Sequence, residues 1–163
     1  MRKLFLVLLV ISGIGFLRPA PSVSVKDFKP ALGKWKGSLT YIDYSSGKPY
    51  TMPVNITISN YEKQGLILKM EYPNEPIANG SDTLFISADG TMLDKASVVS
   101  NKKIGNNIRE IVTDRDGTDG NDYRKAVLRY IYTISKSKFI CRKEVRFDGE
   151  EKFILRNEYN MNR

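Results

Sequence analysis

Apolar and polar side chains alternate strictly over residues 50–59 of this 163-residue chain. The apolar face of the stretch carries Tyr50, Met52, Val54, Ile56 and Ile58. Successive side chains of a β-strand point to opposite faces of the sheet, so the pattern predicts a strand with one buried face. Because proline cannot donate a ladder hydrogen bond, Pro53 on the polar face predicts a bulge or a sheet edge at that point.

Eight further segments are rich in β-forming residues and end at turn signals. They cover residues 33–44, 65–72, 83–88, 91–99, 104–113, 123–135, 139–147 and 153–161. Asp89 and Gly90 predict a hairpin between the third and fourth of these segments, and residues 114–122 predict a loop. Residues 23–32 predict a turn or a single helical turn. Short strands without helices predict an all-β fold, a single up-and-down antiparallel β-barrel of about 8–10 strands.

The first residues of the chain have the composition of an export signal. Arg2 and Lys3 precede an apolar run over residues 4–17, and small residues follow at Ala20 and Ser22. This order predicts a signal peptide over residues 1–22 and one barrel domain over residues 23–163, in the periplasm or outside the cell. The alternative is a membrane anchor that is not cleaved, although the run is shorter than the ~20 residues of a spanning helix.

The chain has a formal net charge of +8. Basic and acidic residues are interleaved, as in residues 142–148, which is typical of a solvated strand face and not of a nucleic-acid surface. We therefore expect no nucleic-acid partner and a monomeric chain. A weak attraction to anionic lipid, glycan or acidic protein is compatible with the positive charge.

The chain contains no histidine and a single cysteine, Cys141. Ser-His and Cys-His catalysis, histidine-ligated haem and most zinc sites require residues that are missing, so we expect no enzyme activity, no cofactor and no metal. The acids of residues 114–122 do not have the spacing of a calcium-binding EF-hand, which favours a turn. Cys141 is in phase with Phe139, Val145 and Phe147, which predicts a buried thiol in the barrel wall.

Tyrosines on the predicted strands combine an apolar ring with a polar hydroxyl, which suits a pocket for a partly polar small molecule. Lys143 shares the face of Cys141, and an inward lysine needs an acid, water or an anionic ligand as its partner. We expect the ligand-binding residues to be Tyr41, Met70, Tyr72, Tyr130, Tyr132 and Lys143.

The opening strand, Leu32-Gly33-Lys34-Trp35-Lys36-Gly37, resembles the Gly-x-Trp start of the calycins, the lipocalin and fatty-acid-binding barrels. The resemblance implies a lipocalin-like barrel in which Gly33 and Trp35 close one end. It also implies a late-strand arginine packed over the tryptophan. Arg156 is the first candidate for that arginine, and Arg146 is the second.

These features predict an exported lipocalin-like protein that holds a small, largely apolar or amphipathic ligand inside the barrel. The alternative is a non-enzymatic interaction or inhibitor module with a filled barrel. A connected interior cavity of ~300 Å³ or more would favour ligand binding, and a filled interior would favour the interaction module.

Overall fold

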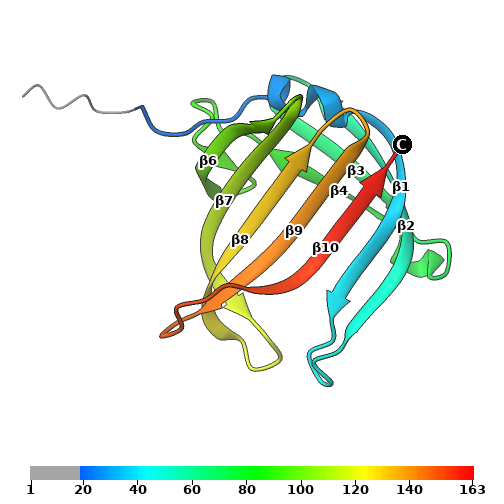
Figure 1. Ribbon diagram of the computed structural model, residues 1–163, viewed down its shortest axis with the longest axis vertical. Coiled ribbons are helices and arrows are strands. Elements are labelled where there is room, and N and C mark those ends of the chain that lie inside the picture. Colours follow the sequence, from blue (N-terminus) through cyan, green and yellow to red (C-terminus); the bar gives the residue numbers. More distant parts are fainter. Residues whose placement is uncertain (1–18) are drawn as a thin grey trace, which may run out of the picture.

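Ten antiparallel strands form one sheet in the order β4-β3-β2-β1-β10-β9-β8-β7-β6-β5 (Figure 1). The computed structural model describes residues 19–163, so most of the predicted signal peptide lies outside the described residues. The strands are β1 (Gly33–Ile42), β2 (Pro49–Tyr61), β3 (Gly65–Glu71), β4 (Gly80–Phe85), β5 (Met92–Leu93), β6 (Ala96–Gly105), β7 (Ile108–Asp119), β8 (Arg124–Ile134), β9 (Lys138–Phe147) and β10 (Ile154–Asn162). The predicted all-β, up-and-down barrel is confirmed.

The sheet closes almost completely into a barrel. The first strand pairs with the last, β1 with β10, from Lys36 opposite Asn162 to Tyr41 opposite Asn157. Gly37 permits this approach, because a Cβ there would clash with the β10 backbone. The remaining seam, between β4 and β5, is joined by a single bridge from Ile86 to Leu93.

At Pro53, β2 has a partner strand on one side only, as the predicted sheet edge requires. The Pro53 backbone is opposite Ser38 of β1, but the pairing of β2 with β3 begins only at Asn55. The side of β2 that faces β3 therefore needs no donor from Pro53.

Three predicted boundaries were wrong. The predicted strand 104–113 is divided between β6, which ends at Gly105, and β7, which begins at Ile108, with a positive φ of 62° at Asn107 in the turn. The segment 91–99 is not one strand, because Asp94 and Lys95 have positive φ (45° and 64°) and separate the two-residue β5 from β6. The predicted loop 114–122 is mostly strand, because β7 runs to Asp119 and pairs with β8 along its whole length. The Asp-Gly step at Gly117 lies within this strand, where the Leu128 side chain covers the space that a Cβ would take.

A short 3₁₀ helix, η1 (Val25–Ala31), lies across one end of the barrel, at the top of Figure 1. Phe28 is fully buried and meets the Tyr132 ring edge-on, at 5.9 Å between centroids. The second 3₁₀ helix, η2 (Pro76–Ala78), lies in the β3–β4 loop. Within residues 19–163, no helix is both long and apolar enough to cross a lipid bilayer.

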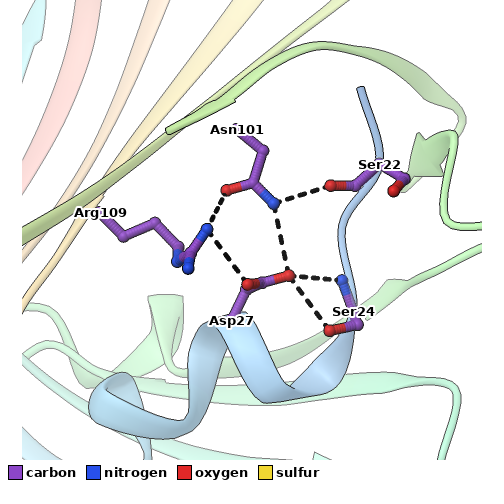
Figure 2. Close-up of polar contacts among 5 residues, drawn as sticks. All are labelled: Ser22, Ser24, Asp27, Asn101 and Arg109. Atoms are coloured by element: carbon purple, nitrogen blue, oxygen red, sulfur yellow. Dashed lines mark hydrogen bonds and ion pairs between the residues drawn. The ribbon is translucent and has the colours of Figure 1, made fainter. Parts of the chain in front are cut away.

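Polar contacts fasten the segment before and within η1 to the β6–β7 hairpin (Figure 2). Asp27 accepts hydrogen bonds from Ser24 and forms an ion pair with Arg109 at 3.2 Å. Asn101 accepts from Arg109 and donates to the Ser22 carbonyl. Residues 22–31 are thus an integral wall of this closed end.

Trp35 fills the closed end beside η1. The indole is 1% exposed, donates a hydrogen bond to the Ala31 carbonyl at 2.6 Å and packs near Phe139. The arginine over the ring is Arg163, with its guanidinium carbon 4.1 Å from the ring centroid, and not the predicted Arg156. Arg163 also donates to the Leu32 and Pro30 carbonyls, so the chain terminus ties η1 to β10.

Trp35→Ala should destabilise the fold by about 3–5 kcal/mol, because it leaves a cavity beneath η1. Urea denaturation measures the loss. The exposed Tyr123 provides the control, since Tyr123→Ala should change the free energy of unfolding by less than ~0.5 kcal/mol. Equal midpoints for Trp35→Ala and the wild type would contradict the placement of the indole.

Candidate functional site: an interior cavity

A cavity of about 410 Å³ lies inside the barrel and borders the plugged end, because its wall includes Ile56, opposite Trp35, and Tyr132, which packs on Phe28. The wall on the side of β2 to β6 comprises Ile56, Leu68, Met70, Leu84, Leu93 and Ala96, together with the carboxyl groups of Asp82 on β4 and Asp94 after β5. The rest of the wall comes from β7 to β10. A small molecule with a large apolar part and a few polar groups matches this lining.

Four of the six predicted ligand-binding residues line this cavity: Met70, Tyr130, Tyr132 and Lys143. Tyr72 is buried beside the cavity, and its hydroxyl shares a 2.9 Å hydrogen bond with the hydroxyl of Tyr159, which is a wall residue. Tyr41 is not in the wall, because its ring packs against Tyr50 at 5.4 Å. Contact of any of these residues with a ligand stays a prediction.

Lys143 finds its partner in Asp119, at the end of β7. The Lys143 Nζ lies 2.6 Å from one carboxylate oxygen, and the Arg156 Nε lies 2.7 Å from the other. The Tyr44 hydroxyl donates a third hydrogen bond to the carboxylate at 3.0 Å. Asp119 is 5% exposed, so these groups form a buried ion network that ties the β1–β2 turn to three strands.

The pKa of Asp119 lies below its ordinary value. Burial alone would raise this pKa, but the hydrogen bond and charge of Lys143, together with Tyr44 and Arg156, outweigh the burial. The carboxylate therefore stays ionised, and it faces two cations, which leaves a net positive charge in the network.

Arg156 belongs to this network because β10 contains an irregularity. Leu155 is opposite Glu144 and Asn157 is opposite Lys143, so Arg156 is an extra residue in the strand. A bulge of this kind re-aims side chains, and here both Arg156 and Asn157 reach the interior. The Arg156 guanidinium lies 4.8 Å from the Tyr44 ring centroid. The predicted role of Arg156 beside Trp35 is therefore wrong, because Arg156 lies at Asp119.

Arg115 lines the cavity from β7 and is the wall residue with an unused hydrogen-bond donor. Its Nε is buried and has no hydrogen-bond partner among residues 19–163. The other end of the guanidinium reaches the Tyr130 hydroxyl at 3.3 Å, which is a long hydrogen bond. Within the described residues, Arg115 forms no ion pair. A buried donor without a partner identifies a place where a ligand or water oxygen would be stabilised.

Cys141 is a free thiol that also lines the cavity. Burial raises the pKa of Cys141 to about 12, so the thiolate nucleophile is nearly absent at neutral pH. Burial also raises the pKa of Tyr132 and of Tyr159, and for Tyr159 the hydrogen bond with Tyr72 adds to the shift. The interior therefore presents neutral hydroxyls and a neutral thiol.

The acidic side chains of residues 114–122 do not converge on one point. Asp114 forms an ion pair with Arg129 at 2.7 Å across the β7–β8 pair, whereas Asp119 points inward. Nowhere in residues 19–163 do three or more potential metal-ligating side chains gather.

Several wall residues were not predicted: Asp82, Asp94, Arg115, Asn157 and Tyr159. Arg115 and Asp119 lie within residues 114–122, whose composition predicts a loop and therefore hides the period-two pattern of β7. Asn157 is inward only because of the bulge in β10. Tyr159 is in phase with the buried Met161, so its position could have been inferred from alternation.

A wider groove of about 810 Å³ lies outside the barrel, between residues 22–26 and the β2–β3 and β4–β5 connections. Its lining consists largely of exposed turn residues, such as Glu62, Lys63 and Asp89. The interior cavity is the better candidate, because it combines an apolar wall with the unpartnered Arg115 donor.

The chain thus folds as an up-and-down β-barrel with an interior cavity. A similar fold occurs in the crystal structure of Rv2717c from M. tuberculosis, with a TM-score of 0.56 and 12% sequence identity. The alignment covers 85% of this chain and 96% of that one, so the likeness extends over the barrel. At this identity, it shows the fold alone. No family model and no curated protein matches the sequence.

Asp119→Asn should destabilise the fold by about 3 kcal/mol at pH 7, because it leaves the charges of Lys143 and Arg156 without a buried counter-ion. Because the folded pKa lies below the unfolded one, ionised Asp119 stabilises the protein above the unfolded pKa, and this contribution is lost as the pH falls through the folded pKa. The advantage of wild type over Asp119→Asn should therefore be constant above about pH 5 and shrink below about pH 4.

Urea denaturation across this pH range measures the difference. Asp114→Asn removes an acid from a more exposed pair and should cost less than ~1 kcal/mol. A pH-independent difference between the wild type and Asp119→Asn would refute the assignment of the stabilisation to the ionised carboxylate.

Proposed function

We propose that this chain is an exported, non-enzymatic binding protein that holds a small, largely apolar molecule in the barrel interior. The observation that carries the proposal is the cavity of about 410 Å³, which exceeds the ~300 Å³ lower bound for a small-molecule pocket. An interaction module with a filled barrel, the alternative from the sequence, would not need this space.

The ligand that fits best is amphipathic. The apolar part would contact residues such as Leu68 and Leu93, and a polar or anionic group would accept from the Arg115 Nε. Tyr130 and Lys143 lie in the same polar wall. Asp82 and Asp94 also line the cavity, which favours a ligand with a single anionic group near Arg115 over one with several.

Export is supported by Arg2 and Lys3 and by the apolar run at residues 4–17. A lipocalin-like role is supported by the Gly33-Lys34-Trp35 opening together with the ten-strand barrel. A role without catalysis is supported by the lack of histidine and by the raised pKa of Cys141.

Two related fluorescent probes test the polarity of the site. We expect 1-anilinonaphthalene-8-sulfonate to bind the barrel more tightly than N-phenyl-1-naphthylamine, which has the same aromatic skeleton without the sulfonate. Arg115→Met should lower the affinity for the sulfonate probe about tenfold and leave the neutral probe within about twofold, because a charge-assisted hydrogen bond contributes about 1.5–3 kcal/mol. Equal losses for both probes would contradict a role for Arg115 in recognising an anion.

A substitution that fills the cavity tests where the probes bind. Cys141→Phe should lower the affinity for both probes at least about tenfold, because the added ring occupies part of the cavity. The neighbouring residue Ile140 is on the opposite face of β9, so Ile140→Phe is the matched control and should bind both probes normally. Unchanged binding by Cys141→Phe, with a cooperative unfolding transition retained, would move the probes out of the barrel and favour the interaction module.

A further inference from the structure

Positive charge gathers at the barrel end that η1 closes. The β2–β3, β4–β5, β6–β7 and β8–β9 connections reach this end together with the chain terminus, as Figure 1 shows. Two backbone hydrogen bonds join these parts, from Val23 to Gly90 and from Arg163 to Ser137. The exposed cations at this end include Lys26, Lys29, Lys63, Lys103, Lys136 and Lys138.

Acidic groups at this end are fewer, and two of them are already paired. Asp27 forms an ion pair with Arg109, and Glu110 forms one with Lys102. The connections at the opposite end differ. Residues 43–48, 72–79, 120–123 and 148–153 contain more acids than lysines. The positive charge of the chain is therefore concentrated at one end of the barrel.

The same end also exposes apolar side chains at the tip of the β6–β7 hairpin. Ile104 and Ile108 are 49% and 36% exposed, and Lys102 and Lys103 directly precede Ile104. Ile108 lines a shallow pocket with Lys26 and Lys136, so the hairpin tip belongs to the basic surface. Exposed aliphatic residues beside lysines are typical of a surface that meets a lipid interface.

We propose that the η1 end of the barrel docks on an anionic phospholipid surface, with the lysines near lipid phosphates and Ile104 and Ile108 in the headgroup region. The lysines belong to separate segments of the chain, which suits many dispersed phosphates better than one acidic protein site. Residues 19–24 also lie at this end. If residues 4–17 remain as the alternative membrane anchor, the barrel therefore presents this basic surface to the bilayer.

Vesicle flotation with the full-length chain tests the proposal. Vesicles of phosphatidylcholine with about one-third phosphatidylglycerol are compared with phosphatidylcholine alone, at ~0.1 M and ~1 M salt. The wild type should bind the anionic vesicles at least about tenfold more tightly at low salt, and high salt should remove this preference. Wild type and all variants carry the same residues 1–22, so any contribution of Arg2, Lys3 and Arg18 is equal when the variants are compared with the wild type.

Charge reversal locates the surface. Lys103→Glu with Lys136→Glu should abolish the preference for anionic vesicles. Lys48→Glu with Lys152→Glu makes the same change in net charge at the opposite end and should keep the preference within about threefold. Both pairs are exposed, and circular dichroism confirms the fold of each variant. Equal wild-type affinity for the two vesicle types, or equal loss in both double variants, would overturn docking through the η1 end.

Discussion

The pairing of the first strand with the last is the constraint on which the rest of the barrel depends. β1 and β10 approach closely at Gly37, where any side chain would meet the β10 backbone. The closure brings Trp35 from one end of the chain under Arg163 from the other. It also brings Tyr44, in the turn after β1, to the Asp119 carboxylate that Lys143 and Arg156 bind. Two interior features, the plugged end and the ion network, thus follow from one strand pair.

The two ends of the interior are closed by different physical means. At the η1 end, Phe28 and Trp35 are buried in an apolar core, where the hydrophobic effect supplies the stability. Towards the other end, Asp119 holds two cations, and buried charges are stable only when each is paired and hydrogen-bonded. The cavity lies between these two zones, and its wall combines apolar side chains with Asp82, Asp94, Arg115 and Lys143.

Alternation alone predicted most of the barrel, because a half-buried strand needs period-two patterning. Residues 50–59 identified β2, and the inward positions of Tyr130, Tyr132 and Lys143 follow from the same rule. The misplaced elements have local causes that alternation does not reveal. The positive-φ turn at Asp94 and Lys95 lacks glycine, and the Asp-Gly step at Gly117 has the composition of a turn although pairing with β8 keeps it extended.

The arginine over Trp35 shows a second limit of sequence reasoning, because Arg156 and Arg146 were the candidates and Arg163 occupies the position. Arg156 and Arg163 both belong to the last part of the chain, and the sequence does not show that a bulge turns Arg156 towards Asp119. The partner of Arg163 depends on the position of η1, whose carbonyls it binds. Contacts between distant segments therefore decided the roles of residues whose types were correctly singled out.

We propose that the interior cavity of the native protein holds a small, largely apolar molecule. Native mass spectrometry of the protein, purified under mild conditions without refolding, tests this claim most directly. We expect a complex with one bound organic molecule that is released when the protein is denatured. The volume of this molecule should fit the cavity of about 410 Å³. A bare protein mass, obtained when the protein is purified from cells in which it is active, would contradict the claim.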